Sequence, residues 1–151
     1  MELGINGRNA IVTGGSQGIG RACAEALAEE GVNVAIVARD ADRLKAAAIE
    51  IADNRKGHVI PISGDLTIGK DIKRIISEAT SALQQIDILI NNAGAAPFGR
   101  IGDLEDSVWQ DCFDLKLMGY VRCAREVMGS MRERRWGRIV NIIGRGGHFP
   151  T

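Results

Sequence analysis

The stretch Thr13-Gly14-Gly15-Ser16-Gln17-Gly18-Ile19-Gly20 decides the fold of this chain. It follows a short β-branched run that ends at Thr13, and it opens a segment in which Ile19, Ala22, Cys23, Ala26 and Leu27 recur at helical spacing. That helix is predicted to end near Gly31. A glycine-rich turn between a strand and a helix lets the backbone approach a pyrophosphate, which the free N–H groups and the dipole of the helix N-terminus would hold. The alternative interpretation is a purely structural glycine turn.

Strands and helices alternate along the rest of the chain. We expect strands at 9–13, 32–37, 58–63, 86–90 and 138–143. Between them, apolar residues at helical spacing predict three helices. The first follows an Asp40 cap and contains Leu44, Ala47, Ala48 and Ile51, and the second contains Ile72, Ile75, Ile76, Ala79 and Leu83. The third is long and contains Trp109, Phe113, Leu117, Tyr120, Ala124, Val127 and Met131. This order predicts a Rossmann-type α/β fold, a doubly wound parallel sheet with strand order 3-2-1-4-5. Pro61 predicts that the third strand lies at an edge of the sheet.

Residues 1–151 form one expected domain, a nucleotide-binding Rossmann domain that we expect to be incomplete. The chain stops eight residues after the fifth predicted strand, so no helix follows to cover one face of that strand. We therefore expect a sheet truncated after its fifth strand and a sequence that is the front part of a longer chain.

Composition excludes several classes of function. Nineteen Lys and Arg balance nineteen Asp and Glu, so no global field favours nucleic acid or an anionic membrane. The apolar runs are too short to span a bilayer, and the N-terminus lacks the pattern of a signal peptide, so we expect a cytoplasmic protein. Three cysteines and two histidines form no metal-ligand motif, and no metal site is expected. The basic run from Arg132 to Arg138 is interpreted as a helix C-terminus, where cations complement the dipole.

The spacing TGxxxGxG resembles the short-chain dehydrogenase/reductase family. Asp65-Leu66, the NNAG run from Asn91 to Gly94, and the run from Gly137 to Asn141 match further motifs of that family in the expected order. The resemblance implies a nicotinamide dinucleotide as cofactor and hydride transfer between it and a small-molecule alcohol or carbonyl compound. It implies cofactor contacts from Gly14, Ser16, Gln17, Gly18, Ile19, Gly20, Arg39, Asp65, Leu66, Asn91, Ala93 and Gly94.

The choice between NADP(H) and NAD(H) depends on the residues that end the second strand. NAD-dependent enzymes place an acidic side chain there to accept hydrogen bonds from the ribose 2′-OH. Ala38 occupies that position, and the neighbouring Arg39 could pair with a 2′-phosphate, so NADP(H) is favoured. In the alternative, Arg39 is merely solvated and Asp40 takes the ribose.

The catalytic residues of the family are not matched. Its asparagine position holds Lys116, and its serine position, three residues after Asn141, holds Gly144. Tyr120 has Ala124 rather than lysine four residues on, and the family's Tyr-x-x-x-Lys segment would fall beyond Thr151. A longer parent chain could still reduce carbonyls, with Lys116 replacing the asparagine in a proton path. Alternatively, the parent is a divergent nucleotide-binding protein without catalysis.

The 151-residue chain by itself is predicted to be inactive. Lys116 and Asn141 are expected to border the substrate, whose identity the sequence does not give. In the resembled family the long helix pairs with its copy in a neighbouring subunit, so a homodimer or homotetramer is expected.

Overall fold

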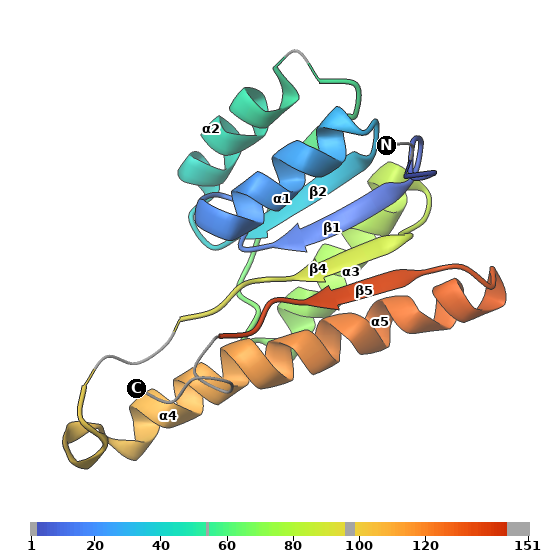
Figure 1. Ribbon diagram of the computed structural model, residues 1–151. Helices are drawn as coiled ribbons and strands as arrows, with labels where there is room; N and C mark the ends of the chain where they lie inside the picture. Colours follow the sequence, from blue (N-terminus) through green and yellow to red (C-terminus); the bar gives the residue numbers. More distant parts are fainter. Residues whose placement is uncertain (1–2, 54, 96–98, 145–151) are drawn as a thin grey trace.

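The computed structural model describes residues 3–53, 55–95 and 99–144. Within them lies a five-stranded sheet with the order β3-β2-β1-β4-β5, as predicted (Figure 1). Its strands are β1 (Asn9–Thr13), β2 (Asn33–Ala38), β3 (Val59–Ser63), β4 (Ile88–Asn91) and β5 (Arg138–Asn141). All four pairings are parallel, so the carboxyl ends of the strands meet at one edge of the sheet.

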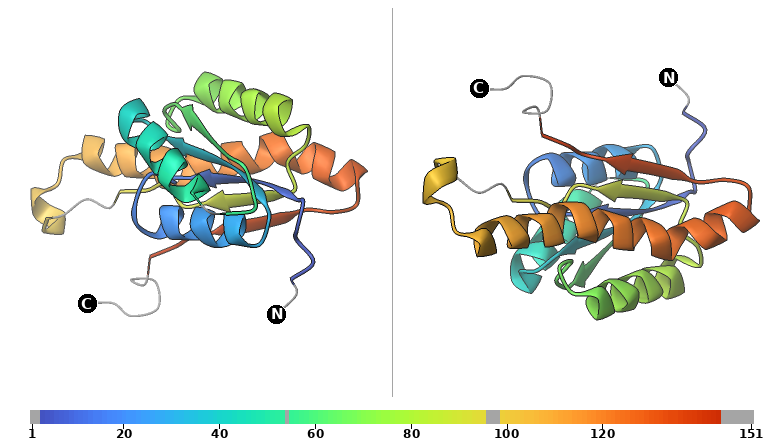
Figure 2. Two further views of the ribbon diagram at one scale, coloured as in Figure 1. Left: turned by 90° about the horizontal axis from the view of Figure 1, so that it is seen from above. Right: turned by 90° about the horizontal axis from the view of Figure 1, so that it is seen from below.

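The helices cover both faces of the sheet. They are α1 (Gly18–Glu29), α2 (Ala41–Ala52), α3 (Gly69–Leu83), α4 (Asp106–Phe113) and α5 (Gly119–Glu133), with a 3-10 turn η1 (Ile101–Asp103) and a π-helical turn η2 (Asp114–Met118). Helices α1 and α2 lie on one face, and α3 and α5 lie on the other (Figure 2). In the part of the chain that the structure describes, no helix is long and apolar enough to cross a membrane.

The core consists of two apolar layers separated by the sheet. Successive side chains of a strand point to opposite faces, so Ile11 packs with α3 and α5 while Ala10 and Val12 pack with α1 and α2. All five residues of β1 are buried, as expected for the central strand of a sheet covered on both sides. This rigid layer fixes the positions of the loops that follow each strand.

The two edge strands differ in their surroundings. Strand β3 carries Pro61 at one edge, as predicted, although the strand starts one residue later than expected. Strand β5 forms the other edge and is exposed along its length, with Val140 43% exposed. The predicted run 138–143 is too long, because the strand ends at Asn141.

The apolar stripe predicted for the long helix is wrong in its first half. Val127 and Met131 are buried, but Phe113 and Leu117 are 52% and 56% exposed. Helix α4 extends beyond the end of the sheet (Figure 1), so none of its residues is buried and this half of the stripe has no strand to pack against. In helix α1 too, the buried residues differ from the predicted apolar stripe. Its buried residues are Gly20, Ala24 and Ala28, while Ile19 is exposed.

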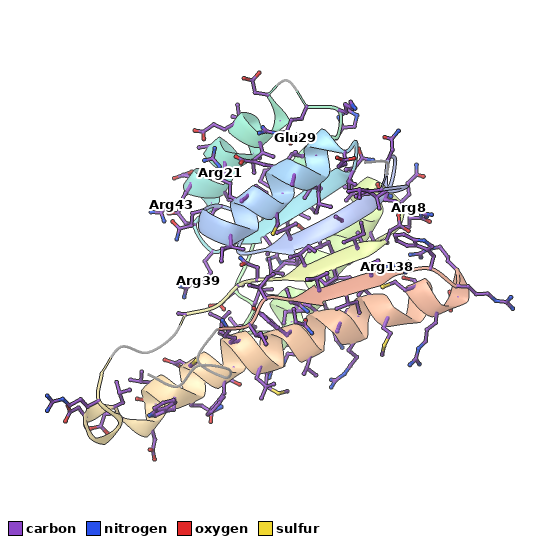
Figure 3. The ribbon with its side chains drawn as sticks, viewed as in Figure 1. Arg8, Arg21, Glu29, Arg39, Arg43 and Arg138 are labelled. Atoms are coloured by element: carbon purple, nitrogen blue, oxygen red, sulfur yellow. The ribbon has the colours of Figure 1, made fainter. Side chains whose placement is uncertain are left out.

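The basic run at the end of α5 makes structural contacts at the amino edge of the sheet. Arg134 donates to the carbonyl of Ile86 at 2.6 Å and lies 3.7 Å from the buried carboxylate of Asp87. The guanidinium groups of Arg8 and Arg138 both lie over the indole of Trp136, 4.0 and 4.9 Å from its ring centre. Figure 3 shows Arg8 and Arg138 at this edge, opposite the end that carries Arg39.

Candidate cofactor-binding site

The candidate site lies at the carboxyl edge of the sheet and begins with the loop between β1 and α1. Gly14 has a positive φ of 67°, and a Cβ there would lie 2.8 Å from the side-chain nitrogen of Asn92. At Gly20 a Cβ would overlap the carbonyl of Gly14 and the same Asn92 amide. Gly18 also has a positive φ, but the space beside it is open. Two glycines therefore bring the loop against its neighbours, and the third leaves its outer side accessible.

A second loop, after β4, is locked to this one by hydrogen bonds. The hydroxyl oxygen of Thr13 accepts from the backbone nitrogens of Asn92 at 2.9 Å and Ala93 at 3.0 Å. The Asn92 side chain in turn donates to the carbonyl of Thr13 at 3.0 Å and to that of Gly14 at 3.3 Å. Thr13 is 1% exposed, so these bonds are shielded from water. The ends of β1 and β4 consequently form one rigid unit.

The N-terminus of α1 presents unsatisfied backbone donors. Its N-cap residue, Gln17, makes no side-chain capping bond, and the first turn contains no acidic residue. The Gln17 side chain instead accepts from Arg43 at 3.0 Å, a contact that connects α1 with α2. An uncapped helix N-terminus with its positive dipole end is suited to an anion such as a phosphate group.

Arg39 and Asp40 follow β2 at the same edge. Arg39 is exposed and forms no ion pair with the residues that the structure describes (Figure 3). Asp40 is the N-cap of α2 and accepts from the backbone nitrogen of Arg43 at 3.0 Å, as the sequence predicts. One oxygen of Asp40 is therefore engaged by its own helix, whereas the Arg39 guanidinium is free to meet an anion.

Two adjoining cavities connect the predicted residues. A cavity of about 110 Å³ is lined by residues that end or follow β1, β2, β3 and β4 and by one residue of η2, among them Gly14, Arg39, Leu66, Ala93 and Leu115. A larger cavity of about 380 Å³ is lined by Arg39, Asp65, Thr67, Ala95 and Cys112. Arg39 lies on both. A cavity of about 720 Å³ is at the opposite end of the sheet around Asn9 and His58, and none of the predicted site residues lines it.

The remaining predicted residues differ in their exposure and in their hydrogen-bond partners. Asp65 uses one oxygen to accept from both the backbone and the hydroxyl of Thr67, at 2.9 and 2.8 Å. Leu66 is buried in the core and offers the cavity only part of its surface. Asn91 is fully buried and donates to the Asn141 side chain at 2.9 Å. Ser16, Gln17 and Ile19 line the accessible side of the loop, where Ile19 is 62% exposed.

Lys116 and Gly144 lie on the β4–β5 half of the same edge. Lys116 belongs to the π-helical turn, and a Cβ on Gly94 would lie 3.2 Å from its Nζ. Gly144 is exposed, and a Cβ there would meet nothing within 4 Å. Tyr120 donates its hydroxyl to the carbonyl of Ile142 at 3.0 Å, and burial raises the pKa of that phenol. Tyr120 thus holds the end of β5 in place.

Several contributors were not predicted as site residues. Thr13 and Asn92 stand inside the quoted motifs, so their identity was visible but the bonds between them were not. Arg43 contacts Gln17 across 26 residues of sequence, and no local pattern indicates that pairing. Cys112, at the end of α4, and Leu115, in the π-helical turn, line the cavity walls, and nothing in their local sequence indicates this.

A parallel sheet with the order 3-2-1-4-5 and a glycine-rich loop at the point where the strand order reverses defines a Rossmann-type α/β protein. The model of the short chain dehydrogenase family matches residues 8–151. The chain therefore belongs to the short-chain dehydrogenase family.

Relatives of known sequence and structure agree with this assignment. The 3-oxoacyl-acyl-carrier-protein reductase FabG of Staphylococcus epidermidis is 36% identical over 137 residues, covering 89% of this chain and 55% of the relative. The 3-ketodihydrosphingosine reductase of Bos taurus is 34% identical over 151 residues, covering 97% and 46%. The crystal structure of L-sorbose reductase from Gluconobacter frateurii, complexed with NADPH and L-sorbose, has a TM-score of 0.88 at 36% identity and covers 92% and 53%. The chain thus spans about half the length of these relatives.

Proposed function

We propose that the chain binds NADP(H) at the carboxyl edge of its sheet. The observation that carries this proposal is the pair of cavities that joins the glycine loop, Arg39, Asp65 and Ala93 in one place. The solved structure of L-sorbose reductase, which contains NADPH, supports it at 36% identity. When bound, the nicotinamide supplies hydride transfer, and the protein supplies binding and orientation.

Each part of the site has a role in this proposal. The open side of Gly18 and the uncapped start of α1 receive the pyrophosphate. Arg39 pairs with the 2′-phosphate through its planar guanidinium, which favours NADP(H) over NAD(H). Asp65 and the wall formed by Leu66 border the adenine, and Ala93 and Gly94 border the nicotinamide end. Gly14, Gly20 and Asn91 act by shaping the loops, since their surroundings are filled by protein.

For the parent protein we propose an oxidoreductase that acts on a small-molecule alcohol or carbonyl compound. Such chemistry needs a group that exchanges a proton with the substrate oxygen. Among the described residues, Gly144 offers no hydroxyl and Tyr120 already donates its hydroxyl to a backbone carbonyl. Lys116, at the position of the family's asparagine, is a polar side chain on this half of the edge that has no hydrogen-bond partner among the described residues. The chain by itself is therefore proposed to bind the cofactor without turnover.

A divergent protein that binds a nucleotide without catalysis is the second candidate. The replacement of the serine by Gly144 favours it, because a glycine cannot hydrogen-bond the substrate oxygen. The two candidates differ in turnover of the parent protein and agree in cofactor binding. A purely structural role would show no nucleotide binding at all.

Self-association is proposed through the outer face of α4 and α5. Phe113, Leu117, Val121 and Met128, on these helices and the η2 turn between them, are all more than a third exposed, and apolar side chains of this kind are typical of subunit interfaces. A homodimer or homotetramer follows from this proposal, and sedimentation velocity measures the oligomeric state.

The cytoplasm is proposed as the compartment, because all three cysteines are free thiols.

Titration calorimetry with NADPH, followed by a carbonyl reduction assay, tests the proposed function. The proposal expects saturable binding of one NADPH per chain, with no oxidation of NADPH above the blank. Oxidation by the 151-residue chain would contradict the proposed inactivity. Absence of NADPH binding would contradict the proposed site itself. A Gly129→Ala variant is the control, because that glycine lies on the exposed side of α5 with open space around it.

A further inference from the structure

Lys116 occupies an irregular turn within an otherwise continuous helical segment. The five residues Asp114–Met118 form a π-helical turn between α4 and α5. Single π turns inside α-helices are uncommon and occur frequently at functional sites, because they redirect one side chain. Here the turn lies at the carboxyl edge of the sheet, next to the loop that follows β4.

The side chain of Lys116 lies over Gly94. A Cβ built on Gly94 would be 3.2 Å from the Lys116 Nζ, 3.3 Å from its Cδ and 3.6 Å from its Cε. The ammonium therefore lies beside the backbone of the loop that follows β4. A lysine on an open surface normally extends its charged end into water. Lys116 is half-buried instead, with its stem against the loop.

The ammonium of Lys116 has no counter-charge among the described residues. It makes no ion pair or hydrogen bond with any of them, and the nearby Asp114 accepts from Gln110 at 3.3 Å. An ammonium without a partner can donate hydrogen bonds to an anionic oxygen, and such charge-assisted bonds are about twice as strong as neutral ones. An anion at this position would supply the missing counter-charge.

Lys116 and the groups proposed to bind the cofactor phosphates lie on opposite halves of the carboxyl edge. Arg39 and the start of α1, which are proposed to hold the cofactor phosphates, follow β2 and β1. Lys116 contacts the loop after β4, and Gly144 follows β5, on the other half of the edge. A dinucleotide that spans the reversal of strand order places its two ends on opposite halves. No described residue would lie within 4 Å of a Cβ on Gly144, so the part of the chain that the structure describes leaves room for a second molecule on this half.

We propose that Lys116 is a specificity-determining residue that binds an anionic group of the substrate. The inference rests on the proposed function and adds the class of substrate, a carbonyl compound or alcohol that also carries a carboxylate or a phosphate. Both groups present the same anionic oxygens to an ammonium, which acts as a point charge and does not require a planar partner. The replacement of an amide by a cation at this position gives the site its preference for charged substrates.

Nuclear magnetic resonance of the ¹⁵N-labelled chain saturated with NADP⁺ tests this proposal. Three probes are titrated separately: 4-oxopentanoate, dihydroxyacetone phosphate and the uncharged 2-pentanone. The chemical shifts of the backbone amides of Gly94 and Gly144 give the affinity for each probe. The quantity compared is the affinity for each anion divided by the affinity for 2-pentanone. An ionic hydrogen bond predicts a ratio of at least about tenfold for the wild type.

Variants at position 116 assign the preference to the ammonium. In Lys116→Met the ratio falls to about one, and in Lys116→Arg it stays within about threefold of the wild type, since the charge is retained. Lys73→Met, a change on the exposed side of α3, is the matched control and keeps the wild-type ratio. Whichever anion has the larger ratio identifies the group as carboxylate or phosphate.

Two outcomes overturn the inference and are distinguishable. Normal NADP⁺ binding with no anion-dependent shift at Gly94, or with the same ratio in Lys116→Met, contradicts the role of Lys116 alone. Failure of the wild-type chain to bind NADP⁺ contradicts the proposed function, and the inference fails with it.

Discussion

The hydroxyl oxygen of Thr13 lies 2.9 Å from the backbone nitrogen of Asn92, across 79 residues of sequence. This bond joins the last residue of β1 to the loop after β4, and the Asn92 side chain returns a bond of 3.0 Å to the Thr13 carbonyl. The glycine loop and the loop after β4 are thus held by the same pair of residues. A cofactor that contacts both loops meets a preformed surface, which lowers the entropy cost of binding.

Thr13→Val tests the importance of this junction. The substitution keeps the shape of the side chain but leaves the backbone N–H groups of Asn92 and Ala93 without their acceptor. We expect the free energy of unfolding to fall by about 1–3 kcal/mol, the typical cost of unsatisfied buried polar groups. Urea denaturation measures it. Thr80→Val is the control, because the Thr80 hydroxyl donates only to the Ile76 carbonyl of its own helix, and an effect as large as that of Thr13→Val would contradict the junction.

Gly20→Ala tests the close approach of α1 to the two loops. The added Cβ would overlap the Gly14 carbonyl and the Asn92 side chain, so the loop must shift. We expect a loss of about 1–3 kcal/mol in unfolding free energy, the usual cost of overpacking, together with weaker NADPH binding. Gly129→Ala, in open space on α5, is expected to stabilise the protein by about 0.5–1 kcal/mol. Equal effects of the two substitutions would show that the contact at Gly20 is unimportant.

The cysteines are expected to differ in reactivity. Burial, with a smaller contribution from Glu126, raises the pKa of Cys123 to about 12, so its thiolate is scarce at neutral pH. Cys112 is half-buried and lines the cavity that also contains Arg39 and Asp65. Iodoacetamide is therefore expected to label Cys112 well before Cys123, as measured by peptide mass, and NADPH to slow the labelling of Cys112. Labelling of Cys123 at the rate of Cys112 in the folded protein would refute the burial argument.

Asp71 is expected to contribute to the acid sensitivity of the fold. Its pKa is lowered, first because its carboxylate accepts from the backbone nitrogen of Asp65 at 2.9 Å and then because it pairs with Arg74. A lowered pKa in the folded state stabilises the fold above the ordinary value of 3.8, and the contribution is lost as the pH falls through the folded value. Asp71→Asn should therefore flatten the decline of stability below about pH 5, measured by denaturation at several pH values. Asp42→Asn, exposed in the first turn of α2, is the control, and an identical decline in wild type and Asp71→Asn would exclude this role.

The sheet order was predictable because it depends on few local signals. Alternating strands and helices, right-handed crossovers and Pro61 at an edge suffice, and the buried face of α2 follows from the spacing of Leu44 and Ile51. The exposure of Phe113 and Leu117 was not predictable from their spacing. It depends on how far the helical segment extends beyond the sheet, and helical spacing carries no signal of that.

The site was predictable in its residues but not in its contacts. Motifs locate Gly14, Arg39 and Gly94 because each follows a predicted strand. The bond from Arg43 to Gln17 and the position of Lys116 over Gly94 depend on how separate loops meet in space. Such long-range pairings leave no periodic or compositional signal in one sequence.

The most direct test of the account compares the affinities for NADPH and NADH in the wild type and in Arg39→Ala. The two cofactors differ only in the 2′-phosphate that Arg39 is proposed to bind. We predict that the wild type binds NADPH at least about tenfold more tightly than NADH, and that Arg39→Ala removes this preference by weakening NADPH alone. Arg132→Ala, an exposed arginine on α5, should keep the wild-type preference. Equal affinities for the two cofactors in the wild type, or a preference that survives in Arg39→Ala, would contradict the account.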